Sequence, residues 1–483
     1  HLSLHDAAAT ELSAEDEAAA GRHFEAADRC RRGALDIDPT ASEAALGLAR
    51  SFEARGEHVE VVKLLDAHVK KLPPPRDDDA SLRRAQVYEL LARAHEAIGS
   101  VGRAIEALER RLKLAEDTAT RVRLAELYNA EPGRDEAALA NHRVLARDLS
   151  RTDSLRALSH AAREASAPYR AYCIDRVLEA LGELDEQASA QLEQQRPAAL
   201  PPHAPYGGEI SDADREGLLT GDDLKLMGEV FATLWGAAPT LLPKDLESHG
   251  VTSKDRVSPA GKEPLALVYS AAARALGIKS TAVYVGEGDP LDPVRVIAMA
   301  PPAVIVPRGV AEHCSVDELR FRVGRALELT QPAYVMAEGM PRERFAEILR
   351  LVLHAFHPRY LRKRPRPTER EMALREEAQQ FRRALPYKIA RSLGELLRER
   401  ADASFDSGAW RKAVDHAATR VGLILSGDLA VALDWVRRRE PELAELEPRA
   451  QVASSEAVSD LLTFAASDSY YICRVKLGLG GNG

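Results

Sequence analysis

Apolar residues along most of the chain recur every three or four positions, which is the spacing of one face of an α-helix. In the N-terminal half these helical segments come in pairs, separated by Gly or Pro. Two stretches in the C-terminal half differ, residues 280–287 and 294–307. They are rich in Val, Ile and Ala with partial alternation, which indicates β-strands. The pattern therefore predicts a mainly α protein with a small sheet in its C-terminal half.

Three segments of the N-terminal half align with one another around a glycine. Gly21, Gly56 and Gly99 each stand where we expect a turn between two helices. The residue five positions later is small or β-branched, and the residue four further on is apolar, so both lie on one face of the second helix. These repeat-core positions are Ala26, Val61 and Ala104, followed by Cys30, Leu65 and Leu108.

The spacing Gly-x-x-x-x-Ala-x-x-x-Phe that these segments follow resembles the core of the tetratricopeptide repeat. A fourth unit surrounds Gly133, and a degenerate fifth unit covers residues 154–184. Successive glycines are 35, 43 and 34 residues apart, whereas that repeat has a period of 34 residues, so the middle step departs from it. The resemblance implies a helical-hairpin solenoid over residues 1–198, whose concave surface binds a protein partner.

Residues 199–224 interrupt the helical pattern with several prolines and glycines, and we expect a linker there. The helical and strand-like segments after it predict an α+β domain over residues 225–440. The remaining residues, 441–483, are expected to form a C-terminal helix and a flexible tail that ends in "GLGGNG".

Two stretches of the expected α+β domain carry a second resemblance. In "AVIVPRGVAEHCSVDELRFRVGRALEL", a strand leads to a helix that Ser315 caps, with Glu318 three residues later as in a capping box. Downstream stands "VDHAATRVGLILSGDLAVAL". The first stretch resembles the HEXXH helix of the gluzincin zinc peptidases, and the second resembles their Glu-x-x-Ala-Asp-x-x-Gly helix, which supplies the third zinc ligand. The resemblance implies a metallopeptidase-like fold.

The positions that would carry the zinc chemistry hold other residues. Arg325 stands for the first His, Ala326 for the catalytic Glu and Leu329 for the second His, while Asp415 stands at the third ligand position. A guanidinium stays protonated and a leucine has no lone pair, so neither can coordinate zinc. We therefore predict an inactive, degenerate site. We also expect Arg325 to form an ion pair with Asp415 or Glu328.

A relocated metal site is the alternative. His354 and His357 are three residues apart, hence on one helix face. Together with Asp415 they could form a new site, which would make the protein a metal-dependent hydrolase.

Composition narrows these possibilities. The 483 residues carry a net charge of −9, so the overall charge does not favour binding of nucleic acid. The basic stretch at 359–370 contains two prolines, which indicates a solvated loop. The four cysteines are far apart in the sequence, as expected of reduced thiols in the cytoplasm. There is no apolar run long enough for a membrane span and no glycine-rich phosphate-binding motif.

The sequence therefore predicts a non-enzymatic protein-interaction scaffold or assembly subunit, with protein partners and possible membership of a large complex. We expect no cofactor, no bound metal, no nucleic acid and no small-molecule substrate.

Overall fold

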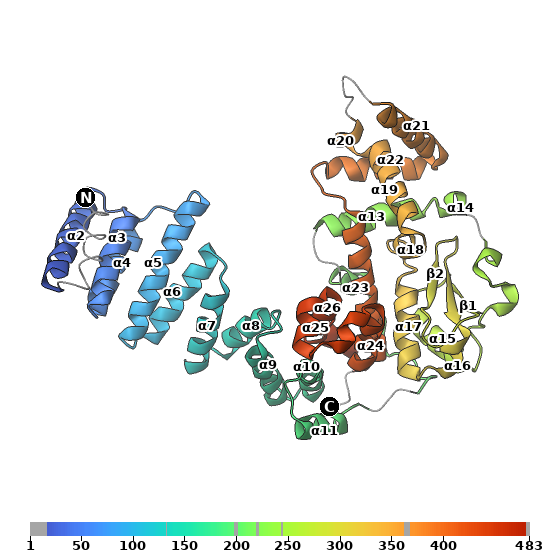
Figure 1. The fold of residues 1–483 in the computed structure, drawn as a ribbon, viewed down its shortest axis with the longest axis horizontal. Coiled ribbons are helices and arrows are strands. Elements are labelled where there is room, and N and C mark those ends of the chain that lie inside the picture. The colour runs from blue at the N-terminus through green and yellow to red at the C-terminus, as the bar shows by residue number, and fades with distance from the viewer. Residues whose placement is uncertain are drawn as a thin grey trace. The chain divides into compact units, whose positions relative to one another are not determined.

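The computed structural model describes residues 17–131, 133–197, 201–218, 222–242, 245–361 and 368–479. Over these residues the chain is mainly α-helical, with helical hairpins first and a small sheet later, which confirms the fold class expected from the sequence (Figure 1). The chain divides into two compact units, His1–Arg147 (unit 1) and Asp148–Gly483 (unit 2).

Unit 1 is a series of helical hairpins. Its helices are α2 (Glu17–Ile37), α3 (Ser42–Ala54), α4 (His58–Lys71), α5 (Asp78–Ala97), α6 (Val101–Leu114), α7 (Thr118–Ala130) and α8 (Asp135–Leu145). Short turns join α3 to α4, α5 to α6 and α7 to α8, which gives three hairpins.

Each of these turns contains a glycine in the left-handed backbone region. The φ angles are +74° at Gly56, +75° at Gly99 and +81° at Gly133. In the first two turns the next residue donates a backbone hydrogen bond five positions back, from Glu57 to Phe52 at 2.9 Å and from Ser100 to His95 at 2.8 Å. This Schellman geometry ends one helix and directs the chain into the next, and glycine adopts it without strain. The turns expected at Gly56 and Gly99 are confirmed.

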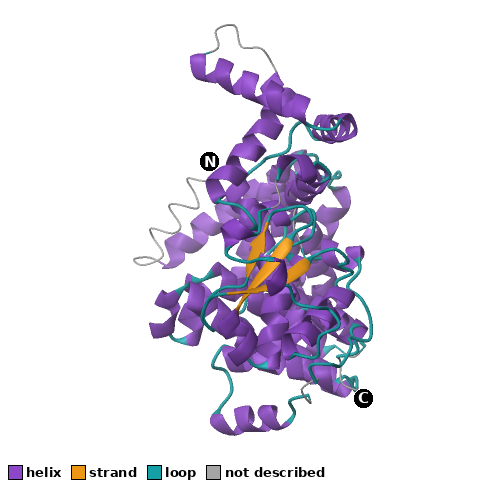
Figure 2. Ribbon diagram, turned by 90° about the vertical axis from the view of Figure 1, so that its right-hand side faces the viewer, coloured by secondary structure: helices purple, strands orange, loops and turns teal. Residues whose placement is uncertain are grey.

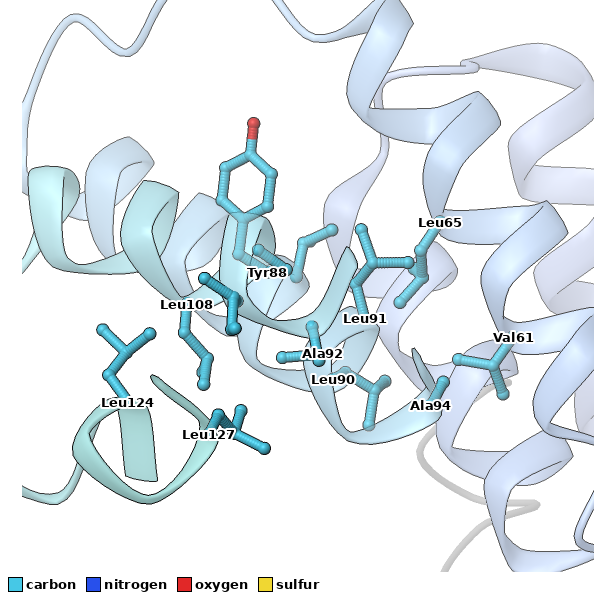
Figure 3. Packing of buried hydrophobic residues seen from close by; sticks show 14 of the residues in the cluster. Val61, Leu65, Tyr88, Leu90, Leu91, Ala92, Ala94, Leu108, Leu124 and Leu127 are labelled. Carbon is cyan, nitrogen blue, oxygen red and sulfur yellow. The ribbon is translucent and has the colours of Figure 1, made fainter. Parts of the chain in front are cut away.

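The interior of unit 1 is one continuous apolar cluster that runs from hairpin to hairpin (Figure 3). The repeat-core residues that follow Gly56 and Gly99 all lie in it, namely Val61, Leu65, Ala104 and Leu108. Each hairpin has one apolar face and covers it with its neighbours, so the core is shared along the series.

The first expected repeat is wrong in register. Gly21 lies inside α2, which runs unbroken from Glu17 to Ile37, and not at a turn. Ala26 is only half-buried and Cys30 is exposed, whereas Ala27 is fully buried. In this continuous helix, the buried face contains Ala27, one position after the Ala26 that the aligned pattern predicted.

The degenerate fifth unit forms a hairpin at the start of unit 2. Helices α9 (Thr152–Glu164) and α10 (Pro168–Ala180) are joined by a turn in which Ser166 has a φ of +56°. The following residue, Ala167, donates to the Ala162 carbonyl at 2.9 Å, as in the turns of unit 1. A serine thus occupies the place that glycine has in the other hairpins. Helix α11 (Glu186–Gln194) follows.

The expected domain boundary near residue 198 differs from the division into units, which falls after Arg147. The reason is that α10 packs against the C-terminal helices α24 (Leu429–Arg439) and α26 (Glu456–Ala465). Residues 201–218 of the expected linker are also fixed within unit 2, since the buried Tyr206 hydroxyl donates to the Leu425 carbonyl at 3.1 Å.

The sheet of unit 2 has three strands, β1 (Ala282–Gly286), β2 (Arg295–Ile297) and β3 (Ala303–Pro307), in the order β1-β3-β2 (Figure 2). Strand β3 is central, parallel to β1 and antiparallel to β2. All five β3 residues are buried, which explains its continuous apolar run. Both stretches expected to form strands do so, and the second divides into β2 and β3.

Helices make up most of the rest of unit 2. Those before and around the sheet are α12 (Asp212–Glu216), α13 (Asp222–Trp235), α14 (Ala238–Leu241), α15 (Pro264–Ala275), α16 (Arg308–His313) and α17 (Val316–Glu328), with short 3₁₀ turns at Glu247–His249 and Ser253–Asp255. Those that follow are α18 (Val335–Glu338), α19 (Arg342–Phe356), α20 (Pro358–Leu361), α21 (Glu369–Ala384), α22 (Tyr387–Glu399) and α23 (Ser407–Ser426).

After α24, unit 2 closes with a 3₁₀ turn at Pro441–Glu445 and helices α25 (Pro448–Ser454), α26 and α27 (Asp468–Lys476). The C-terminal region thus holds several helices, where the sequence predicted one. They are part of the unit's core, since the buried Arg474 donates to the Tyr169 hydroxyl at 2.7 Å and to the Ile424 carbonyl at 2.9 Å. Of the expected tail, residues 480–483 lie outside the described part of the chain. None of the described helices is both long enough and apolar enough to cross a membrane.

Candidate functional site

Helix α17 is the segment that the sequence singles out, and it begins as predicted. The Ser315 side chain accepts from the Glu318 backbone N–H, and the Glu318 carboxylate accepts from the Ser315 backbone N–H at 3.0 Å. This is the expected capping box. Further along α17, Arg325 and Ala326 are buried, and Leu329, the residue that ends the helix, is fully buried.

Helices α17 and α23 cross in close contact because each has a glycine at the crossing. A Cβ on Gly324 would lie 2.5 Å from Leu425, and one on Gly422 would lie 2.9 Å from the Phe321 carbonyl oxygen. Side chains at these two positions would push the helices apart. The close crossing brings the end of α17 near the middle of α23, where Asp415 lies.

The Asp415 carboxylate is held by two guanidinium groups. Arg325 of α17 donates to it from a buried position, and Arg439 at the end of α24 donates to both of its oxygens at 2.7 and 2.8 Å. The ion pair expected between Arg325 and Asp415 is therefore confirmed. Both guanidinium carbons also lie over the Trp435 ring, at 5.0 Å for Arg325 and 5.7 Å for Arg439.

The electrostatics of this cluster favour the charged carboxylate. Burial alone would raise the pKa of Asp415, but the charges and hydrogen bonds of Arg325 and Arg439 outweigh it and hold the pKa below its usual value. The carboxylate is thus an acceptor in a three-helix ion cluster that joins α17, α23 and α24.

Glu328, the other partner considered for Arg325, is paired elsewhere. Its side chain is fully buried and accepts from Arg215 Nε at 3.0 and 3.2 Å. Arg215 also donates to the Ile210 and Leu276 carbonyls at 2.9 and 2.7 Å. Burial raises the pKa of Glu328 despite this partner. The pair attaches segment 201–218 to the end of α17.

A groove lies on the exposed side of Asp415. It has a volume of about 880 Å³, with α23 as its floor, α18 and α19 on one side and α24–α26 on the other. Figure 1 shows α23 between these two groups of helices. The floor residues follow one face of α23, from Ser407 through Arg411 and Asp415 to Thr419. The lining is rich in charged side chains of both signs.

The residues of the alternative metal site are not brought together. His354 and His357 lie at the end of α19, where both rings contact Tyr360, with centroids 4.8 and 5.6 Å away. Burial lowers the pKa of both histidines. Asp415 is engaged with its two arginines. Among the described residues, no three His, Cys, Asp or Glu side chains form a group that could hold a metal ion.

Sequence reasoning missed Arg215, Arg439 and Trp435. Arg439 and Trp435 are four residues apart on α24, so their shared helix face was a readable signal. Arg215 carries no such signal, because it is 113 positions from Glu328 in the chain. The predicted solvated loop at 359–370 is described only in part, since residues 362–367 lie outside the described ranges.

No family model matches the chain, and no curated protein matches it. Among solved structures, "Crystal structure of MamA protein" is similar over 41% of this chain and 98% of that chain, at 17% sequence identity and a TM-score of 0.27. A likeness at this TM-score carries no argument about function.

Proposed function

We propose that the protein is a non-enzymatic scaffold for protein–protein interaction. In this proposal the helical hairpins of unit 1 bind a partner protein, and unit 2 is a metallopeptidase-like domain without a zinc site that serves for docking. It acts in the cytoplasm, as one subunit of a larger assembly. The four cysteines support this location, because all of them are unpaired.

The observation that supports the proposal most directly is that the Asp415 carboxylate accepts hydrogen bonds from both Arg325 and Arg439. The resemblance to gluzincins puts a zinc ligand at Asp415 and another at Arg325, and here these two residues bind each other. A guanidinium cannot give a lone pair to a metal, and its fixed charge repels a cation. Leu329 and Ala326, at the second ligand and catalytic positions, are buried apolar residues. The four positions together support binding without peptide hydrolysis.

Charged side chains on the first helices of the unit 1 hairpins support partner binding. Arg93 of α5 donates to Glu53 of α3 at 3.1 Å, and Arg123 of α7 donates to Glu96 of α5 at 2.9 Å. The two arginine side chains are half-exposed. They form a ladder of charges across three neighbouring helices, which is a surface suited to a polar, charged partner segment.

The test combines partner capture with an activity assay on the full chain. Partners are captured from the cells that produce the protein with the parent chain, with Arg93→Glu/Arg123→Glu, and with Lys63→Glu as a control. Lys63 is an exposed residue on the second helix of a hairpin and pairs with the exposed Glu60 on the same helix. We expect the ladder variant to lose a partner that the other two retain, and casein to remain uncut by all three with zinc added. Equal capture by all three, or casein cleavage that Asp415→Asn abolishes, contradicts the proposal.

A further inference from the structure

A second groove lies within the first helices of unit 2. It has a volume of about 360 Å³ and lies between α9 and α11, with residues of α10 between them. The lining residues of α9 follow one face of that helix, from Arg156 through Ser159 and His160 to Arg163. This volume is near the lower end of the range for ligand sites, about 300–1,000 Å³, so the groove suits a few anchoring side chains of a larger ligand.

The base of this α9–α11 groove is apolar. Leu178 of α10 and Leu192 of α11 are buried, and Leu184 and Ala188 beside them are half-buried. Half-buried apolar side chains still contact water, so the hydrophobic effect would stabilise a ligand side chain such as leucine that covers them. An apolar anchor is therefore one requirement for the ligand.

The charge that the lining exposes is carried by guanidinium groups. Apart from His160, its ionisable residues are Arg156, Arg163 and Asp175. The two arginine side chains are 51% and 53% exposed, whereas the Asp175 side chain is 10% exposed. Asp175 accepts from Ser159 at 2.6 Å and from Arg163 Nη2, which leaves Nε and Nη1 of Arg163 without a partner among the described residues. A carboxylate of a ligand can therefore accept from the exposed sides of both arginines.

The carboxylates that flank the lining have partners of their own. They do not line the groove, and their contacts are Glu183 with Arg156 and Arg449, Asp185 with the Ala188 N–H that it caps, and Glu164 with His160. Because Glu183 is shared by two arginines, that group keeps one net positive charge. An acidic ligand is the second requirement.

The two arginines set a spacing for the ligand. Arg156 and Arg163 stand on one face of α9, seven residues and therefore about 10.5 Å apart along the helix. In a ligand helix that lies along α9, acidic residues seven positions apart have the same separation. Apolar residues three and four positions after the first acidic residue lie between them on the same face. One helix can therefore bring carboxylates to α9 and apolar side chains to the base.

We propose that the α9–α11 groove binds an acidic amphipathic α-helix of a partner protein. Carboxylates of this helix pair with Arg156 and Arg163, and its leucine-type side chains cover Leu184 and Ala188. The inference rests on the proposed function in one respect, that the ligand is a segment of a partner protein. The groove belongs to unit 2 and is a docking site in addition to the charge ladder of unit 1.

Fluorescein-labelled synthetic peptides test the proposal. The test peptide, (Glu-Ala-Ala-Leu-Leu-Ala-Ala)₂-Glu, has its acidic and apolar residues on one helix face. The first control, (Glu-Ala-Leu-Ala-Ala-Leu-Ala)₂-Glu, has the same composition and charge but its leucines on the opposite face. The second control, (Lys-Ala-Ala-Leu-Leu-Ala-Ala)₂-Lys, reverses the charge. In fluorescence anisotropy with the full chain, we expect the test peptide to bind at least about tenfold more tightly than either control.

One substitution in the lining locates the site. His160→Glu, at an exposed position, places a carboxylate one helical turn from both Arg156 and Arg163. There it competes with the ligand, so binding of the test peptide should weaken about fivefold. Ala190→Glu is the matched control, because it adds a negative charge at an exposed position of α11 that does not line the groove, and it should bind like the parent. Circular dichroism checks that each variant is folded.

The outcomes separate this inference from the proposed function. No binding of the test peptide, equally tight binding of either control peptide, or equal effects of His160→Glu and Ala190→Glu overturns the inference and leaves partner capture by unit 1 unaffected. Peptide binding with the expected preferences, together with equal partner capture by the parent and by Arg93→Glu/Arg123→Glu, overturns the proposed role of unit 1 and supports the groove as a docking site.

Discussion

Different interactions stabilise the hairpins of unit 1 and the centre of unit 2. In unit 1 the order comes from a local turn that recurs at Gly56, Gly99 and Gly133, and from an apolar core shared between neighbours. In unit 2 an apolar core is joined by a few buried ionic contacts between distant residues. Arg325 and Asp415 are 90 positions apart, and Arg215 and Glu328 are 113 apart. We therefore expect single substitutions to have large effects at the centre of unit 2 and small, local effects in unit 1.

The largest effect is expected for Arg215→Ala. It would leave the fully buried Glu328 carboxylate without its cation, at a cost of about 3 kcal/mol in the free energy of unfolding at pH 8. Urea denaturation measures it. The control is Arg391→Ala, which breaks an exposed ion pair with Glu395 on α22 and should cost below about 0.5 kcal/mol. Equal effects of the two substitutions would contradict the contrast between buried and exposed pairs.

The Arg215→Ala penalty should also depend on pH. Because burial raises the folded-state pKa of Glu328, this group favours folding below its ordinary pKa, and that contribution is lost as the pH rises through the folded pKa. Without Arg215 the folded pKa rises further, so the carboxyl stays neutral to higher pH. The penalty should be smaller at pH 5 than at pH 8. A penalty that does not change with pH would mean that Glu328 has found another partner.

Arg325→Ala is next in size. It removes one of two cations from Asp415, whose side chain is still 21% exposed, so we expect a loss of about 2 kcal/mol in the free energy of unfolding. In a double-mutant cycle with Asp415→Asn, the combined loss should be smaller than the sum of the single losses. Strict additivity would mean that the ion pair does not contribute to stability.

Acid unfolding gives an independent view of the same pair. The folded-state pKa of Asp415 is lowered, so its contribution to stability is present above its ordinary pKa and is lost as the pH falls through the folded value. Arg325→Ala raises that folded pKa, and the midpoint of acid unfolding should move to higher pH. Circular dichroism measures the midpoint of acid unfolding. An unchanged midpoint would show that Arg439 alone sets the pKa of Asp415.

In unit 1, Gly99→Ala should cost roughly 1–2 kcal/mol, because an L-residue is strained at a φ of +75°. No heavy atom lies within 4 Å of the added Cβ, so backbone strain is the whole effect. The matched control is Gly33→Ala inside α2, where there is also space but φ is helical. That substitution should stabilise unit 1 by about 0.5–1 kcal/mol. Changes of the same sign at both sites would contradict the role of the turn.

The smallest change is expected at the serine that replaces glycine in the α9–α10 turn. Ser166→Gly relieves the positive φ of +56° and should raise the free energy of unfolding by about 0.5–1 kcal/mol. Thermal denaturation of the variant beside the parent measures it. A loss of stability would show that the serine side chain stabilises the turn more than its backbone strain costs.

Local patterns could be predicted from the sequence, and long-range pairings only in part. Gly56 and Gly99 were placed correctly because a left-handed turn has a residue preference of its own, whereas Gly21 was misplaced because a helix also tolerates glycine. Arg325 was assigned two candidate partners. The choice of Asp415 over Glu328 depends on the crossing of α17 and α23 and on Arg215, neither of which is a local feature.

The central proposal is that unit 2 keeps the framework of a zinc site whose ligands have been replaced. The most direct test is to restore them with Arg325→His, Ala326→Glu, Leu329→His and Asp415→Glu, and to measure zinc in the folded chain by atomic emission after dialysis. The account predicts about one zinc ion per chain in this variant and none retained by the parent. A folded variant that binds no zinc, or a parent that retains stoichiometric zinc until Asp415 is replaced by Asn, would contradict it.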